Sequence, residues 1–191
     1  MAAQVSSSVL SPNVIDVQVA LVLEATRGDR AAQDTLYRAH VQAMYGLALR
    51  LLGSPADAED VLQESFADAF MSLGQLRDPN LFGAWVRTIV VRRAHRLLRR
   101  RMFLRRLGLH GASVETHLEE SIAGPHAPPD VRLELATLYS AMAAWPAKER
   151  VAYCLKRVEG LSLEEIVEAT GVSRATVERR LTRARARLAA F

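Results

Sequence analysis

The chain has 191 residues, of which 50% are hydrophobic, which excludes a disordered chain and allows one ordinary domain or two small ones. Aromatic residues make up only 6%, and Ala, Leu and Arg, all good helix formers, dominate, which favours an all-α fold. The net charge is +4, and every cation except Lys148 and Lys156 is an arginine. Arginine suits bidentate contact with phosphates and guanine edges, although a GC-rich genome explains its abundance equally well.

Cysteine content and hydropathy exclude several kinds of site and cellular location. Cys154 is the only cysteine, so we expect no internal disulfide, metal site or cofactor, and we expect Cys154 to be an inert buried residue. The N-terminus lacks a basic leader, and Asp16 and Glu24 interrupt its apolar residues, so no signal peptide is predicted. No run of 18 apolar residues occurs, so we predict no insertion into a membrane and expect a cytoplasmic protein.

In the first half of the chain, residues 1–15 are expected to form a flexible tail, and residues 16–106 a helical domain. The helix starts are predicted from Asp29, Ser54-Pro55 and Asn80, and the stops from glycines. The predicted helices cover about residues 16–27, 29–52, 55–73 and 81–106. Between the last two, "GQLRDPN" is predicted to be a loop, because the residue before a proline avoids the helical conformation.

Residues 107–130 are rich in Gly, Pro and acidic residues and show no clear period, which predicts a flexible linker. Residues 131–191 are predicted to form a second helical domain. Its first helix covers 131–144 and is broken at Trp145-Pro146, and Ser162 with Glu165 predicts a capping box for a later, short helix. The predicted fold is therefore two small all-helical domains joined by a flexible linker.

The C-terminal stretch "LSLEEIVEATGVSRATVERRLTRARARL" has the spacing of a helix-turn-helix motif, with Gly171 at the tight turn. One stripe of the last helix is predicted to be buried, at Val177, Leu181, Ala184 and Leu188. The other side is a candidate to read a DNA major groove, at Arg174, Ala175, Thr176, Glu178, Arg179, Thr182 and Arg183. The alternative is a helical hairpin with a solvated basic face.

A second basic helix is predicted over "WVRTIVVRRAHRLLRRRMFLRR", which has nine arginines and no acidic residue. One face of this helix is a candidate nucleic-acid surface, at Thr88, Arg92, His95, Arg96 and Arg99. Phe82 and Trp85 begin the helix, where aromatic rings can stack on unpaired bases; packing in the core is the favoured alternative for both rings. For the arginine face the alternatives are solvent or an acidic protein partner.

An acidic helix lies between these features in the sequence, since residues 51–76 contain no Lys or Arg. Its apolar side is predicted to be buried, at Ala58, Val61, Leu62, Phe66, Ala69 and Phe70. The polar side chains are predicted to point outward, at Asp57, Asp60, Gln63, Glu64 and Asp68. Such a face repels DNA and suits a basic protein partner, but a solvated face with acids near a helix N-terminus is an equal alternative.

Together these stretches resemble the extracytoplasmic-function (ECF) sigma factors of bacterial RNA polymerase. The N-terminal resemblance rests on "GDRAAQDTLYRAH", "SPADAEDVLQESFADAF" and "LFGAWVRTIVVRRAHRLLRRR". The C-terminal resemblance rests on "WPAKERVAYCLKRVEGLSLEEIVEATGVSRATVERRLTRARARL". It covers about residues 19–101 and 131–188, which is most of the chain. The acidic motif at this distance from a helix-turn-helix is the specific part of the match.

The resemblance implies a sigma factor that binds core RNA polymerase, recognises promoter DNA and promotes transcription initiation. The acidic helix would dock on the clamp coiled coil of the β′ subunit through Asp57, Asp60, Gln63, Glu64 and Phe66. The basic helix would bind and help to open the −10 element through Phe82, Trp85, Thr88, Arg92, His95, Arg96 and Arg99. The last helix would read the −35 element through the major-groove candidates given above.

The same resemblance implies no catalytic residue and no small-molecule substrate, because the polymerase carries out the chemistry. It also implies an anti-sigma factor as a partner. The chain departs from the family at Arg92 and Arg96, where Asn and Asp are usual, and at Phe70, where Trp is common. The first two departures lie on the DNA-facing surface, so the −10 sequence, like the regulon and the inducing signal, stays undefined.

Two other classes of function stay open. A stand-alone helix-turn-helix regulator would bind duplex DNA without a polymerase, but it has no use for a second nucleic-acid helix and an acidic docking face. A helical enzyme or RNA-binding accessory protein is the other class. No nucleophile–base pair, phosphate-binding loop or metal cluster in the sequence supports an enzyme.

Overall fold

The computed structural model describes residues 12–107, 137–139, 141–142 and 144–190, which contain helices and turns but no strand. The helices are α1 (Pro12–Thr26), α2 (Arg30–Leu52), α3 (Pro55–Met71), α4 (Phe82–Arg106), α6 (Ala147–Arg157), α7 (Leu163–Thr170) and α8 (Arg174–Ala189). Two short 3₁₀ turns, η1 (Leu73–Gln75) and η2 (Pro79–Leu81), join α3 to α4. The all-α prediction is confirmed. None of the described helices is both long and apolar enough to span a bilayer.

Caps that the sequence predicted set the boundaries of α2 and α3. The Asp29 carboxylate accepts hydrogen bonds from the backbone N–H groups of Ala31 and Ala32 at 2.8 and 3.1 Å. Gly53 ends α2 in the left-handed conformation, with φ 73°, which only glycine adopts without cost. The Ser54 hydroxyl then accepts a hydrogen bond from the first turn of α3. These boundaries were predictable because each cap is formed within a few residues.

Two predicted boundaries between α3 and α4 are wrong. α3 ends at Met71 rather than at residue 73, and Ser72 closes it by donating both its N–H and its hydroxyl to the carbonyl of Asp68. Asn80 does not cap α4. Instead, the Asp78 carboxylate accepts a hydrogen bond from the Asn80 backbone N–H at 3.0 Å and caps η2, which runs directly into α4.

Some predictions fall partly outside the described residues. The tail prediction is tested only from residue 12 onward, where α1 has already begun, four residues earlier than expected. The predicted linker lies outside the description beyond residue 107. Of the helix predicted over 131–144, residues 137–139, 141–142 and 144 are described; the first five are helical and residue 144 lies in a turn.

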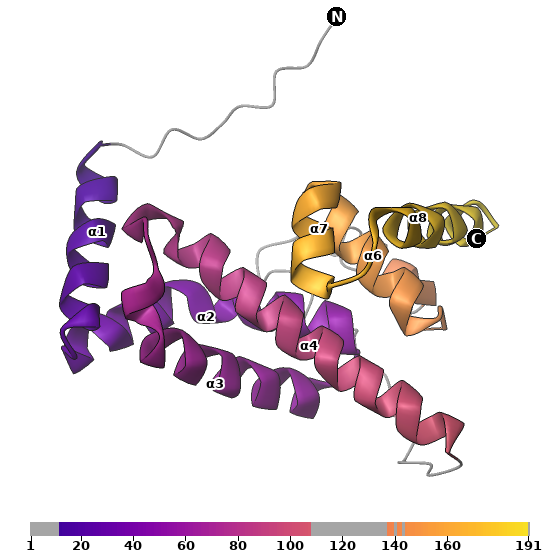
Figure 1. Cartoon of the computed structure of the whole chain (residues 1–191), viewed down its shortest axis with the longest axis horizontal. Coiled ribbons are helices and arrows are strands. Elements are labelled where there is room, and N and C mark those ends of the chain that lie inside the picture. The colour runs from indigo at the N-terminus through magenta and orange to yellow at the C-terminus, as the bar shows by residue number, and fades with distance from the viewer. Residues whose placement is uncertain (1–11, 108–136, 140, 143, 191) are drawn as a thin grey trace, which may run out of the picture.

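The N-terminal half is a bundle in which α2, α3 and α4 pack against one another (Figure 1). α1 lies at the end of this bundle, in contact with α2 and with both 3₁₀ turns. The side chains at its centre are fully buried, among them Leu36, Leu47, Leu51, Phe82, Val86 and Val90. Because α3 and α4 are neighbours, the acidic and basic helices predicted from the sequence lie side by side.

The C-terminal half contains the predicted helix-turn-helix. The capping box is formed in full: the Ser162 N–H donates to the Glu165 carboxylate at 2.7 Å, and the Glu165 N–H donates to the Ser162 hydroxyl at 3.1 Å. Gly171 ends α7 with φ 67° and turns the chain into α8. The predicted stripe of α8 is buried at Val177 and Leu181, so the opposite side of α8 faces outward.

The two halves of the chain are in contact with each other. α6 packs against α2, and α7 packs against α4. The cartoon shows α7 standing beside the middle of α4, with α6 and α8 beyond it (Figure 1). This contact places the helix-turn-helix next to the second basic helix.

Candidate nucleic-acid and polymerase interface

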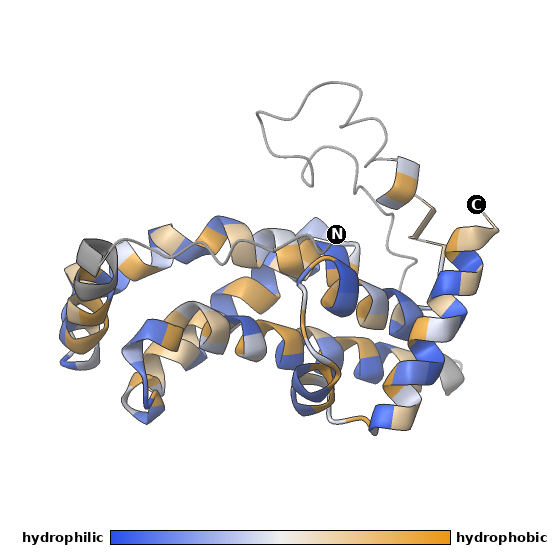
Figure 2. Ribbon diagram, turned by 90° about the horizontal axis from the view of Figure 1, so that it is seen from above, coloured by the Kyte–Doolittle hydropathy of each residue, from blue (hydrophilic) through white to orange (hydrophobic). Residues whose placement is uncertain are grey.

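The predicted DNA-reading side of α8 is exposed. Of its seven candidate residues, Thr176 is half-buried and the other six are exposed. The six are Arg174, Ala175, Glu178, Arg179, Thr182 and Arg183. Hydrophilic residues dominate the visible side of this C-terminal helix (Figure 2). The geometry therefore matches a recognition helix that presents one polar side and buries the other.

The cations of this surface differ in how they are held. Arg174 is paired with Glu178 at 3.0 Å and also with Glu164 of α7, and the hydrogen bond to Glu178, followed by the two negative charges, raises the pKa of Arg174. Arg179 donates only a long hydrogen bond of 3.4 Å, to the Thr176 hydroxyl, and Arg183 has no ion pair within the described residues. Of the three arginines in this set, Arg179 and Arg183 are therefore the two without an ion pair among the described residues.

An ion pair with a buried carboxylate, which the sequence did not indicate, holds α8 in place. The Glu149 carboxylate of α6 is almost fully buried and accepts a hydrogen bond from Arg187 Nε at 2.7 Å. A buried carboxylate needs such a partner, because an unpaired buried charge is strongly unfavourable. Arg187 is thus a structural residue of the helix-turn-helix, although its arginine neighbours point to solvent.

The proposed −10 face of α4 is only partly open. Arg96 and Arg99 are exposed, and Arg92 is exposed but lies 3.1 Å from the carboxylate of Glu168 on α7. His95 is only 8% exposed. Burial, followed by repulsion from Arg180 and Arg99, lowers the pKa of His95 below its ordinary value of 6.5. The imidazole is therefore a neutral group covered by the protein.

The aromatic residues at the start of α4 pack in the core. Phe82 is 0% exposed, and its ring lies 5.3 Å from His40, 6.3 Å from Phe70 and 6.4 Å from Trp85, between centroids. The favoured alternative, core packing, is confirmed for Phe82, so its inclusion among the −10 contacts is corrected. Trp85 is half-buried.

The acidic helix α3 buries the side that the sequence predicted. Ala58, Val61, Leu62 and Ala69 are buried. Phe66 is 3% exposed, with its ring edge-on to Tyr37 at 4.8 Å. The assignment of Phe66 to the polymerase-binding surface is therefore corrected as well: its ring packs beneath that surface and does not form part of it.

The acidic side chains of α3 separate into two groups. Arg101 of α4 holds Asp57 in a two-pronged ion pair of 2.5 Å, and Arg93 of α4 binds both Glu64 and Asp68. Three other polar side chains of α3 are exposed without an ion pair among the described residues: Glu59, Asp60 and Gln63. The sequence analysis did not predict these pairings, because Arg93 and Arg101 lie outside the face assigned to nucleic acid and received no partner there.

The described residues show no cluster suited to metal binding, and their one cysteine is not poised as a nucleophile. They contain no set of three or more His, Cys, Asp or Glu side chains able to hold a metal ion. Cys154 is buried, and burial raises the pKa of its thiol to about 12. A thiol with that pKa stays protonated at neutral pH and is a poor nucleophile.

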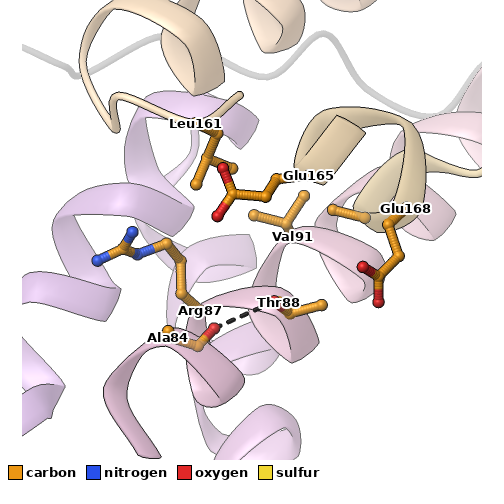
Figure 3. A pocket seen from close by; sticks show the side chains of 8 residues that line it. Ala84, Arg87, Thr88, Val91, Leu161, Glu165 and Glu168 are labelled. Atoms are coloured by element: carbon orange, nitrogen blue, oxygen red, sulfur yellow. Dashed lines mark hydrogen bonds between the residues drawn. The ribbon is translucent and has the colours of Figure 1, made fainter. Parts of the chain in front are cut away.

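A small cavity of about 60 Å³ lies where α7 meets α4 (Figure 3). Arg87 and Thr88 of α4 line one side, and Glu165 and Glu168 of α7 line the other. Its size leaves room for water rather than for a ligand. The cavity therefore marks the interface between the two halves, and it is too small to be a substrate site.

Known proteins match both halves of the chain. The family model for Sigma-70 region 2 matches residues 36–103, and the model for Sigma-70, region 4 matches residues 135–188. The ECF RNA polymerase sigma factor SigE of Mycolicibacterium smegmatis is 36% identical over 87% of this chain and 65% of its own length. The RNA polymerase sigma factor NccH of Alcaligenes xylosoxydans xylosoxydans is 32% identical over 92% of this chain and 94% of its own length.

Two solved structures have a similar fold. CnrH in complex with the cytosolic domain of CnrY has a TM-score of 0.55 and 26% identity, over 92% of this chain and 96% of that one. The sigma factor RpoE in complex with the anti-sigma factor NepR, from Bartonella quintana, has a TM-score of 0.59 and 23% identity, over 81% of this chain and 92% of that one. At that identity the second match concerns the fold alone.

Proposed function

The chain belongs to the ECF group of the sigma-70 family, and from this membership we propose which of its surfaces binds the polymerase and which bind each promoter element. It is a promoter-recognising sigma factor and not a stand-alone regulator. The observation that carries this conclusion is that regions 2 and 4 both match in one chain, and that each contains one of the basic helices, α4 and α8.

We assign polymerase docking to the exposed, unpaired part of α3, centred on Asp60 and Gln63, with Glu59 added. Asp57 and Glu64 contribute less in this proposal, because Arg101 and Arg93 already neutralise them. The proposed partner is the clamp coiled coil of the β′ subunit. A basic surface on that coiled coil would complement the negative charge of α3. Phe66 supports the surface from below by packing on Tyr37.

For DNA, we propose that the −10 element is bound by the start and the exposed face of α4. The residues are Trp85, Thr88, Arg92, Arg96 and Arg99. The −35 element is bound by the outer side of α8. Arg179 and Arg183 lead the −35 contacts, because they are not committed to ion pairs. His95 would join the −10 surface only after a rearrangement that exposes it, because it is 8% exposed. The two domains of the proposal are residues 16–106, which α1 extends to residue 12, and residues 131–191, joined by a linker over residues 107–130.

The polymerase supplies the chemistry in this proposal, and the chain supplies recognition and melting, so it is not an enzyme. Its place of action is the bacterial cytoplasm, where polymerase and chromosome meet. CnrH, a sigma factor of Cupriavidus metallidurans by its name, was solved with the cytosolic domain of CnrY. We extend to this chain a protein partner of the same kind, an anti-sigma factor.

Charge reversal at Asp60 tests the docking assignment. Asp60→Arg should weaken the binding of core polymerase at least about tenfold, equal to about 1.4 kcal/mol, while binding of the full-length chain to −35 duplex DNA changes little. Asp34→Arg is the matched control, because Asp34 is also exposed on a helix of this half but lies outside the docking surface. Equal core affinity of both variants and the unmodified chain would sink the assignment.

A further inference from the structure

The C-terminal end of α4 extends past the helix beside it. Arg101 pairs with Asp57 in the first turn of α3, so the residues of α4 after Arg101 lie beyond the start of α3. The cartoon shows this end of α4 projecting from the bundle (Figure 1). Beyond Leu98, which is buried, no described side chain up to Leu107 is buried. Core packing among the described residues therefore does not explain which side chains this end carries.

An exposed aromatic ring lies among arginines at this end. Phe103 is 61% exposed, and Arg99 and Arg100 precede it by four and three residues, which places them beside the ring on the helix surface. Both arginines, and Arg96 one turn earlier, are exposed and have no ion pair among the described residues. The result is a positively charged surface with an apolar centre, which suits a polyanion that also offers an apolar group.

This surface continues the proposed −10 face along the same side of α4. Trp85 and Phe103 are 103 − 85 = 18 residues apart, which is five turns of an α-helix at about 3.6 residues per turn. Their side chains therefore leave the helix in the same direction, and Arg92 and Arg96 lie between them on that side. At about 1.5 Å per residue, the two positions are about 27 Å apart, which equals about eight base pairs of DNA.

The Phe103 end of this face would meet paired DNA. In the proposed function, Trp85 lies at the unpaired bases of the −10 element, and α8 binds the −35 element as a duplex. α4 would then lead from the unpaired bases toward the duplex that joins the two elements. An aromatic ring cannot stack on paired bases without separating them, but it can pack on the methyl group of thymine, the apolar group that base pairs present in the major groove.

We propose that the end of α4 is a further DNA-binding site, for the duplex between the −10 and −35 elements, where Arg100 binds a phosphate and Phe103 contacts a thymine methyl group in the major groove. The proposal rests on the assignment of the chain as a sigma factor. DNA is favoured over an apolar partner because arginines surround the ring. The site adds a base preference outside the two promoter elements.

Removal of thymine methyl groups tests the contact of Phe103. The probe is a promoter fragment that the reconstituted polymerase transcribes from a library of genomic fragments, with its spacer rebuilt from A·T pairs so that each step contains a thymine. Polymerase carrying the unmodified chain should bind this fragment about fourfold more tightly than the same fragment with deoxyuridine throughout the spacer, as the burial of one methyl group predicts. Phe103→Ala should bind both fragments equally.

Leu23→Ala is the matched control for the loss of an exposed apolar side chain, because Leu23 is 47% exposed on α1 and lies outside the proposed DNA surfaces. It should keep the fourfold preference for thymine. If Phe103→Ala keeps that preference as well, or if the unmodified chain has none, Phe103 does not contact a thymine methyl group and the proposal is wrong.

Arg100→Ala tests the phosphate contact. It should weaken the binding of both fragments alike, and it should reduce the slope of log affinity against log salt concentration by about one. Arg30→Ala is the control, because Arg30 is exposed at the start of α2 and away from the proposed DNA surfaces. Equal slopes for these two variants contradict the contact.

Two further measurements distinguish other roles of the ring. A lower unfolding temperature of Phe103→Ala with unchanged DNA binding would make Phe103 a packing residue. Binding to phosphatidylglycerol vesicles that depends on Phe103, again with unchanged DNA binding, would assign the end of α4 to a membrane surface; either result overturns the proposal. A complete lack of initiation by the unmodified chain would instead contradict the sigma-factor assignment, whereas initiation that is insensitive to Phe103→Ala and Arg100→Ala contradicts only this site.

Discussion

At the scale of single residues, Arg179 is the side chain best placed to recognise a base in the −35 element. It lies on the outer side of α8 and is not held by an ion pair among the described residues. Arg179→Ala should cost about 1–3 kcal/mol at one base position, because arginine can bind guanine with two hydrogen bonds. Anisotropy titrations on −35 duplexes substituted one position at a time would measure this loss.

Arg185→Ala is the comparison within the same helix. Arg185 is exposed but is not among the proposed base contacts, so its loss should weaken all duplexes alike and reduce the salt dependence. If Arg179→Ala behaves in this uniform way too, Arg179 contacts phosphate and the base assignment is wrong.

Two histidines, the buried His95 and the half-buried His40, predict how stability depends on pH. Burial lowers the pKa of His40, and burial together with Arg180 and Arg99 lowers that of His95, both from an ordinary value of 6.5. The unfolded chain therefore takes up protons more readily, so this stability is present above pH 6.5 and is lost as the pH falls below it. Urea unfolding at pH 7.5 and 5.5 should show a larger loss for the unmodified chain than for His40→Gln/His95→Gln. Equal losses would show that these imidazoles do not contribute.

Arg93 and Arg101 show which residue roles a sequence pattern cannot assign. Both lie in residues 85–106, which contain nine arginines, and both bind carboxylates of α3 instead of facing DNA. The pattern along one helix reveals the sign and spacing of charges, whereas a partner on another helix depends on how the two helices pack. Phe66 and Phe82 were misplaced for a related reason, because an aromatic residue near a functional motif can form its supporting core.

At the scale of elements, the capping box of α7 sets the start of the helix-turn-helix. Ser162→Ala removes the side-chain oxygen that accepts the Glu165 N–H, and it should lower the free energy of unfolding by about 0.5–2 kcal/mol. Ser173 offers a control, because it precedes α8 but its side chain makes no capping hydrogen bond. Chemical unfolding should therefore show a smaller loss for Ser173→Ala; an equal or larger one would contradict the capping account.

Elements with local signals were predictable, and those that depend on packing were not. Asp29, Gly53, Ser162 and Gly171 act within a few residues of themselves, and the structure contains each of these caps and turns. The link between α3 and α4 was less predictable. There Asp78 rather than Asn80 makes the capping bond, and two 3₁₀ turns that contact α1 replace the expected loop.

For the whole molecule, the sequence indicated two helical regions but not how they meet. Arg50 and Glu159 are 109 residues apart in the chain, and neither lies in a motif that marks an interface. Their pairing arises only when α6 rests on α2. Fold class and function could be predicted from motifs, whereas the packing of one helical region on the other depends on contacts that no local pattern encodes.

The central claim is that this chain gives core RNA polymerase its promoter specificity. Reconstitution with core polymerase and run-off transcription on a library of genomic fragments tests this most directly. The expected result is a stable complex that initiates at a limited set of sites sharing −10 and −35 elements, with core enzyme alone as the blank. Failure to form that complex, or duplex DNA binding without any initiation, would contradict the claim and favour a stand-alone regulator.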